Sequence, residues 1–199
     1  MQKAKVAVLV SGGGTNLQAL IDYTKNNNAN FEISLVISNK EDAYALKRAK
    51  NSNIETEIVL RNEFNDSIEF ENRIKQILKE NEIDLIVLAG FMSILTENFT
   101  SEYPNKIINV HPSLIPSFCG KGFYGLKVHE AALEYGVKLT GATVHFVNEI
   151  PDGGKIIKQK AVQIEENDTP ETLQKRVMEQ AEWIILPEAV NEVAEEFIK

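Results

Sequence analysis

The amino-acid sequence predicts a single-domain α/β fold with a mostly parallel sheet flanked by helices. Short runs rich in β-branched residues alternate along the chain with longer segments of helical period, which is the pattern of successive strand and helix units. The expected strands lack the alternation of apolar and polar residues that a half-exposed sheet shows, because helices would cover both of their faces. No repeat, low-complexity segment or flexible linker divides the 199 residues, so we expect one domain, residues 1–199.

Nine elements are expected in the first part of the chain. The strands are residues 5–10, 32–37, 57–60, 84–89 and a run that ends at 111, and the helices are residues 15–25, 42–50, 66–80 and 96–102. The strands carry β-branched runs, and the helices carry apolar residues at helical spacing. The fourth strand is continuously apolar, which indicates burial on both faces. Pro112 cannot donate a hydrogen bond to a neighbouring strand, so the fifth strand ends at its edge.

The last third of the chain changes character. We expect a helix at 126–135, a pair of strands at 142–147 and 155–162, and one or two helices over 170–197. Pro187 is expected to interrupt the last of these, because proline lacks the amide hydrogen that a helix interior requires.

Composition excludes several classes of function. The chain has 29 acidic and 21 basic residues and a net charge of -8, which argues against a general nucleic-acid or membrane-binding surface. Its single cysteine, Cys119, excludes an intrachain disulfide and a multi-thiolate metal site. No apolar run approaches the roughly 20 residues that span a bilayer, and the amino terminus has no signal-peptide pattern. We therefore expect a cytoplasmic protein without nucleic-acid or membrane partners, and we expect it to be a monomer or homodimer.

Asn109 and His111 are the first candidate site residues. Alternate side chains of a strand point to the same face, so this pair can converge on one reacting group. Both lie at the carboxyl end of a strand, where open α/β sheets bind their ligands. Taken alone, the motif is more typical of a turn-capping asparagine and a hydrogen-bonded structural histidine, and the other motifs of the chain favour the functional interpretation.

A glycine-rich turn follows the first strand, at residues 11–16. Its glycines let a backbone approach an anion, and the unpaired amides of the following helix face it. Leu17 occupies the third small position of the dinucleotide fingerprint, and the second strand ends in Ser38-Asn39-Lys40, with no acid to hold an adenosine ribose. The turn therefore predicts a mononucleotide-type phosphate site, with a tight structural turn as the alternative.

Two further loops are candidates. Residues 89–95 form an apolar loop that can line a pocket for a flat heterocycle, or simply pack in the core. Asp152 lies in a turn rich in proline and glycine, where an aspartate serves either its own backbone or chemistry.

Together these motifs resemble the glycinamide ribonucleotide formyltransferase family. The resemblance covers nearly the whole chain and rests on VLVSG at 8–12, LAGFM at 88–92, NVHPSLIP at 109–116, GATVHFV at 141–147 and DGG at 152–154. It implies a Rossmann-like formyltransferase fold, 10-formyltetrahydrofolate as the formyl donor without a metal, and the amine of glycinamide ribonucleotide as the acceptor in purine biosynthesis.

The resemblance also implies site residues. The implied catalytic residues are Asn109, His111 and Asp152. The implied ribonucleotide contacts are Gly13, Gly14, Thr15, Asn16, Gly90, Pro112 and Glu182. The implied folate contacts are Met92, Ser93, Ile94, Leu95, Asn109, Asn148, Glu149, Ile150 and Pro151. The ribonucleotide half spans about residues 1–100, and the folate and catalytic half about residues 85–199.

Two departures and several alternatives qualify this interpretation. Ser67 and Ser93 stand where members of the family carry arginine, so charge recognition of the folate glutamate tail is not predicted there. Formyltetrahydrofolate deformylase, which uses water as the acceptor, and methionyl-tRNA formyltransferase are the nearest alternatives. They usually carry an additional amino-terminal or basic carboxyl-terminal domain. A zinc hydrolase built on His111 and His145 lacks the usual close ligand spacing.

Overall fold

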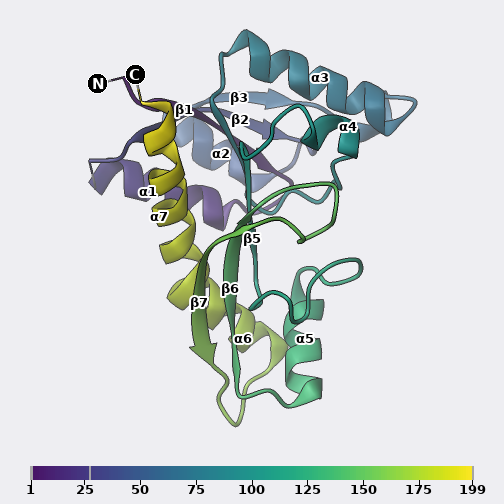
Figure 1. The fold of residues 1–199 in the computed structure, drawn as a ribbon, viewed down its shortest axis with the longest axis vertical. Helices are drawn as coiled ribbons and strands as arrows, with labels where there is room; N and C mark the ends of the chain where they lie inside the picture. Colours follow the sequence, from purple (N-terminus) through teal and green to yellow (C-terminus); the bar gives the residue numbers. More distant parts are fainter. Residues whose placement is uncertain (1, 27, 199) are drawn as a thin grey trace.

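A computed structural model describes residues 2–26 and 28–198 of the chain (Figure 1). The strands are β1 (Ala4–Val10), β2 (Phe31–Ser38), β3 (Glu55–Ile58), β4 (Leu85–Leu88), β5 (Ile107–His111), β6 (Leu139–Phe146) and β7 (Ile156–Gln163). The helices are α1 (Thr15–Asn26), α2 (Tyr44–Asn51), α3 (Ser67–Glu80), α4 (Glu97–Thr100), α5 (Leu126–Tyr135), α6 (Pro170–Val177) and α7 (Trp183–Ala194). Among the described residues, none of the helices is both long and apolar enough to cross a membrane.

The strands form one sheet in the order β3-β2-β1-β4-β5-β6-β7. Neighbouring strands are parallel from β3 to β5, whereas β5 with β6 and β6 with β7 are antiparallel. The predicted α/β fold with a mostly parallel sheet is therefore confirmed. β2 and β3 lie on one side of β1, and β4 to β7 lie on the other side. The switch point of the strand order therefore lies between β1 and β4, and open α/β sheets bind their ligands at the carboxyl ends of the strands at such a point.

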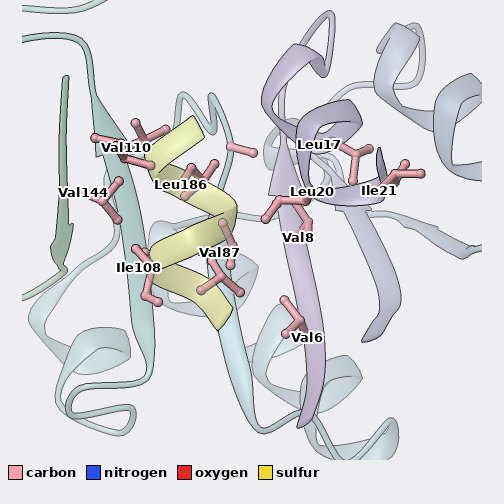
Figure 2. Close-up of a cluster of buried hydrophobic side chains, with 14 of the residues drawn as sticks. Val6, Val8, Leu17, Leu20, Ile21, Val87, Ile108, Val110, Val144 and Leu186 are labelled. Atoms are coloured by element: carbon pink, nitrogen blue, oxygen red, sulfur yellow. The ribbon is translucent and has the colours of Figure 1, made fainter. Parts of the chain in front are cut away.

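Helices cover both faces of the sheet, as the continuous apolar strands predicted. On one face Val6 and Val8 of β1 pack with residues of α1, α2, α6 and α7 (Figure 2). On the other face Ala7 and Leu9 pack with residues of α3 and α4. The alternation continues in β5, where Ile108 belongs to the first cluster and its neighbours face the second layer.

Two strands differ from the sequence prediction by two or more residues at one or both ends, whereas the bounds of the others agree to within one residue. β3 begins and ends two residues earlier than 57–60, because it is an edge strand whose length is set by pairing with Leu35–Ser38 of β2. β6 begins three residues before 142 and includes Gly141. A Cβ at Gly141 would lie 2.1 Å from the carbonyl oxygen of Lys160, so a glycine permits the close approach of β7 at a position that a sequence pattern interprets as a strand break.

Pro187 does not interrupt the last helix, and the prediction that it would was wrong. It lies inside α7 and is buried. The irregularity lies one turn earlier, in the π-helical turn η2 (Met178–Glu182), which ends directly before Trp183. A proline ring meets the carbonyl group four residues before it, here that of Trp183, so the widened turn lies on the side where a proline disturbs the helix.

Candidate active site

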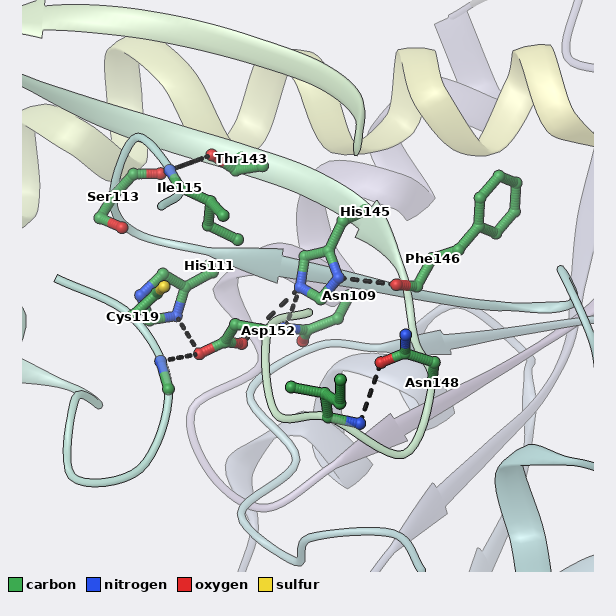
Figure 3. Close-up of polar contacts among 12 residues, drawn as sticks. Asn109, His111, Ser113, Ile115, Cys119, Thr143, His145, Phe146, Asn148 and Asp152 are labelled. Carbon is green, nitrogen blue, oxygen red and sulfur yellow. Dashed lines mark hydrogen bonds and ion pairs between the residues drawn. The ribbon is translucent and has the colours of Figure 1, made fainter. Parts of the chain in front are cut away.

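Asn109 and His111 lie at the carboxyl end of β5 and reach the same cluster of polar groups (Figure 3). Ile108 and Val110 pack in the core on the opposite face, as strand alternation requires. β6 runs beside β5, and its His145 is the direct cross-strand partner of Asn109. Asp152 enters from the loop after β6. The structure therefore brings together the three predicted residues and adds His145.

Asp152 joins the two histidines. Its Oδ2 lies 3.5 Å from His111 Nδ1, and its Oδ1 lies 3.7 Å from His145 Nε2. The backbone N–H of Gly120 donates to Oδ2 over 2.8 Å. The side chains of His111 and His145 are 6% and 1% exposed, and that of Asp152 is 14% exposed, so solvent screens their charges weakly.

Two backbone carbonyl groups determine where the imidazole hydrogens lie. His145 Nδ1 is 2.8 Å from the carbonyl oxygen of Phe146, and His111 Nε2 is 2.8 Å from that of Phe118. A carbonyl oxygen only accepts, so both nitrogens carry hydrogen. A neutral His145 then accepts at Nε2 from Asn109 Nδ2, 3.2 Å away. The second N–H of the Asn109 amide remains to donate to a bound group.

The turn that carries Asp152 has a demanding backbone. Asp152 adopts φ 57°, in the left-handed region, which aspartate tolerates better than most side chains. The N–H of Gly153 donates to the carbonyl of Ile150 over 2.9 Å. A Cβ at Gly154 would lie 1.7 Å from the carbonyl oxygen of Phe146, so only glycine fits there. The Asp-Gly-Gly sequence thus fixes the carboxylate against the histidines.

The environment keeps Asp152 ionised. Burial by itself would raise the pKa of this carboxyl, but the neighbouring imidazoles of His145 and His111 and the amide of Gly120 together hold the pKa below its usual value. Nearby His129 on α5 behaves in the opposite sense. Burial, helped by the charge of His111, lowers the pKa of His129 to about 4, and neither of its ring nitrogens has a hydrogen-bond partner among the described residues.

The glycine-rich turn connects β1 to α1 as predicted. Gly14 adopts φ +70°, and a Cβ there would lie 2.6 Å from the Cβ of Ala45 on α2. Arg48 Nε donates to the carbonyl of Gly13 over 2.8 Å. Gly12 and Gly13 have open space at their Cβ positions. The turn is therefore packed against α2 through Gly14 and open to the solvent at the two preceding glycines.

Residues from opposite ends of the chain meet beside this turn. Asn16 Nδ2 donates to Glu182 Oε2 over 2.7 Å, and Glu182 lies in the π-helical turn with 6% of its surface exposed. Burial raises the pKa of Glu182, and the hydrogen bond from Asn16 opposes that shift. Asn16 Oδ1 is buried and has no hydrogen-bond partner among the described residues. The pair offers polar groups toward the glycine-rich turn.

The loops predicted to contact folate carry exposed apolar side chains. Met92, Ile94 and Ile150 are 56%, 74% and 58% exposed, whereas Leu95 is buried. Asn148 Oδ1 accepts from the N–H of Ile150 over 3.0 Å.

A cleft of about 330 Å³ separates α4 from the loop after β6. Asn148 and Glu149 line it. Met92, Ser93, Ile94 and Leu95 are not among its lining residues, so the two predicted folate segments do not line this cleft together.

The other predicted residues lie on strand ends and loops. Gly90 follows β4 with φ +72° and is exposed, and Pro112 follows β5 half-buried. Ser67 accepts from Arg61 over 3.3 Å, and Ser93 accepts from Asn39 over 2.9 Å.

His145 is a functional candidate that the sequence motifs did not single out, since a histidine within a strand pattern is typical of a packed side chain. One feature of the sequence could have indicated it. His145 lies in the strand that follows the strand of Asn109, and antiparallel pairing of the two strands places it opposite Asn109. Among the described residues, the His, Cys, Asp and Glu side chains form no group of three or more that could hold a metal ion. The expectation of no metal stays a prediction.

The comparisons agree with this geometry. The model of the formyl transferase family matches residues 4–190. The phosphoribosylglycinamide formyltransferase of Haemophilus influenzae is 45% identical over 183 residues, which are 92% of this chain and 84% of the relative. The human trifunctional purine biosynthetic protein adenosine-3 is 46% identical over 97% of this chain, which spans only 18% of that longer protein.

Solved structures give the same result. The phosphoribosylglycinamide formyltransferase of Coxiella burnetii superposes with a TM-score of 0.90 at 41% identity, over 98% of this chain and 89% of the other. The glycinamide ribonucleotide transformylase 1 of Symbiobacterium toebii gives 0.91 at 37% identity, over 98% and 89%. The resemblance drawn from the sequence motifs is confirmed, and the chain belongs to the formyl transferase family.

Proposed function

We propose that this protein transfers the formyl group of 10-formyltetrahydrofolate to the primary amine of glycinamide ribonucleotide, giving formylglycinamide ribonucleotide and tetrahydrofolate in purine biosynthesis. One observation carries the proposal: Asp152 joins His111 and His145, and His145 orients Asn109, at the carboxyl end of β5. The family match and the names of the relatives over most of this chain support the same reaction.

The reaction needs hydrogen-bond donors and a route for one proton. The amine nitrogen bonds to the formyl carbon, negative charge collects on the formyl oxygen, and the bond from that carbon to the folate nitrogen then breaks. Asn109 donates its second amide N–H to the oxygen, and a protonated His111 donates from Nε2. The carboxylate of Asp152 favours the charged imidazole and helps move the proton from the attacking nitrogen to the leaving nitrogen through water.

His111 must exchange one partner for this role. In the structure its Nε2 hydrogen is donated to the carbonyl of Phe118. The formyl oxygen therefore takes the place of that carbonyl when substrate binds. Phe118 has φ 49°, a left-handed backbone that is costly for an aromatic residue. This strain favours a shift of the segment when the formyl oxygen replaces the Phe118 carbonyl as the acceptor.

We propose that the ribonucleotide binds at the glycine-rich turn. The amides of Gly13, Gly14, Thr15 and Asn16 would face its phosphate, at the start of α1. Glu182, held by Asn16, would accept from its hydroxyl or amide groups, and Gly90 and Pro112 would border it. Binding energy from the remote phosphate orients the amine against the formyl carbon.

We propose that the folate binds on the other side of the Asn109 amide. The exposed side chains of Met92 and Ile94, with Ser93 and Leu95 between and beside them, would form one wall. Residues 148–151 would form the other, with their backbone groups reading the edge of the heterocycle. The ribonucleotide half would then span about residues 1–100 and the folate and catalytic half about residues 85–199.

The oligomeric state and location belong to the same proposal. We infer a monomer or homodimer. We also infer that the protein works in the cytoplasm, since its one cysteine, Cys119, is free and suits a reducing compartment. Light scattering of the purified protein distinguishes the two assemblies, and a larger particle would contradict both.

A single assay tests the reaction. Purified protein is mixed with 10-formyltetrahydrofolate, with and without glycinamide ribonucleotide, and tetrahydrofolate release is followed. We expect turnover to depend on the ribonucleotide, and glycinamide without the ribose phosphate to be a very poor acceptor. Full turnover without ribonucleotide, with free formate as product, would favour the deformylase instead.

A further inference from the structure

Glu71 on α3 is a buried carboxylate that the proposed chemistry does not use. It is 1% exposed, and none of the described residues forms an ion pair with it. Its two oxygens accept from Thr96, one from the backbone N–H over 2.7 Å and the other from the hydroxyl over 2.5 Å. A buried carboxylate needs such hydrogen bonds in place of water, so the contact holds Thr96 firmly against α3.

Thr96 ends the loop of residues 89–96, which is here called the β4–α4 loop. Within this loop Met92 and Ile94 point outward, 56% and 74% exposed, while Leu95 is buried and packs in the core. Apolar side chains stay presented in this way only if the backbone that carries them is fixed. Thr96 gains no side-chain hydrogen bond from capping α4, so its hydroxyl serves the contact with Glu71.

Two other side chains hold the same loop nearer its start. The hydroxyl of Ser11, in the glycine-rich turn, accepts from the N–H of Met92 over 2.8 Å. Asn39, after β2, donates to Ser93 over 2.9 Å. Glu71 holds the far end of the loop. It comes from α3, which packs on the face of the sheet that carries Ala7 and Leu9.

We propose that Glu71 is a positioning residue that acts through Thr96: it fixes the β4–α4 loop as a wall of the folate site and so sets the affinity for the formyl donor without touching it. This rests on the proposed placement of folate against Met92 and Ile94. The ribonucleotide site has its own supports in α2 and η2, so loss of the Glu71 contact acts on one substrate.

Steady-state kinetics of hydroxyl variants test the proposal. Thr96→Val removes the hydroxyl at nearly constant volume, and Thr96→Ser keeps it. We expect Thr96→Val to raise the KM for 10-formyltetrahydrofolate about five- to tenfold, the size of one lost hydrogen bond to a charged group moderated by the two remaining anchors. The KM for glycinamide ribonucleotide and kcat should stay within about twofold, and Thr96→Ser should restore the wild-type values. Glu71→Gln provides a second variant with the same expected direction.

Two further variants separate the possible outcomes. Asn191→Ala removes the side-chain oxygen that accepts from the backbone N–H of Asn30, and should lower Tm without changing either KM. Ile94→Ser probes the wall directly. If Ile94→Ser raises the folate KM while Thr96→Val and Glu71→Gln do not, the role of Glu71 is rejected and the folate placement stands. If Ile94→Ser has no effect, the folate placement fails and the role of Glu71 with it. Equal changes in both KM values for Thr96→Val would show a merely structural contact.

Discussion

Replacing Asp152 with asparagine tests the polar cluster most sharply. The change keeps the size of the side chain and an acceptor for the Gly120 amide, but it removes the charge that lies 3.5 Å from His111 Nδ1. At that separation one unit charge stabilises another by about 1 kcal/mol in water and about 5 kcal/mol at the effective dielectric of protein sites. Because both side chains are nearly buried, the loss lies toward the upper value.

A loss of this size predicts that Asp152→Asn lowers kcat by about 10²–10³. The KM values for both substrates should change by less than about threefold. Without the carboxylate, the charged form of His111 that the proposed chemistry needs is less favoured, so the alkaline limb of the kcat profile should shift to lower pH. The measurement is kcat against pH for the wild type and the variant, at saturating ribonucleotide and folate.

Asp168 supplies the matched control. Its side chain is 2% exposed and pairs with Arg176, and the hydrogen bond from Arg176 lowers the pKa of Asp168 to about 2, but Asp168 lies outside the cluster. Asp168→Asn should lower Tm and leave kcat unchanged. If Asp152→Asn kept kcat within about threefold of wild type, or lost activity only through KM, the role given to the carboxylate would be wrong.

Three more predictions follow from the same contacts. Gly13→Val should raise the ribonucleotide KM far more than the folate KM, because the Cβ position of Gly13 is open to a ligand. Gly14→Val should instead lower Tm, because its Cβ would lie 2.6 Å from that of Ala45. Equal effects of Gly13→Val on the two KM values would count against the phosphate site. His145→Leu should reduce kcat about five- to tenfold in steady-state assays through the lost hydrogen bond to Asn109, and an unchanged kcat would refute this. The folded-state pKa of His129 is about 4, so the unfolded state binds more protons between about pH 6.5 and 4. The free energy of unfolding should therefore fall by up to about 1.4 kcal/mol per pH unit as pH drops through that window. Urea unfolding at several pH values measures it, and a His129→Leu variant with the same pH dependence of stability as the wild type would contradict the prediction.

Sequence patterns predicted the fold well because each strand is bounded by residues with a clear physical meaning. Pro112 marks the end of β5, and the continuous apolar run of β4 indicates burial on both faces. The patterns failed where tertiary contacts override local preference. Gly141 looks like a strand break but is the residue that lets β6 and β7 approach, and Pro187 sits in a helix whose irregularity was moved into the preceding turn.

The candidate site was predictable where the chain itself brings residues together. The spacing of Asn109 and His111 on one strand suffices to place them on one face. Contacts across the sheet or between chain ends could not be predicted in this way, since they depend on strand order and helix packing. His145 opposite Asn109, Glu182 beside Asn16 and Glu71 beneath Thr96 all join positions that no local pattern relates.

The Gly14 position illustrates the same limit at one residue. A glycine before a helix indicates a close approach of something to the backbone, and the sequence suggested a phosphate. In the structure the neighbour of Gly14 is the side of α2, and the open glycines are Gly12 and Gly13. A substitution at Gly14 therefore probes packing, and Gly13 is the position that probes the ligand.

The central claim is that the formyl group passes directly from folate to an amine. It is tested most directly by supplying 10-formyltetrahydrofolate labelled with ¹³C in the formyl carbon, together with glycinamide ribonucleotide, and following the label by NMR. The account predicts that the signal moves to the formamide of the ribonucleotide, at a rate that Asp152→Asn lowers by about 10²–10³. Label that appears in free formate, at the same rate with or without the ribonucleotide, would contradict it.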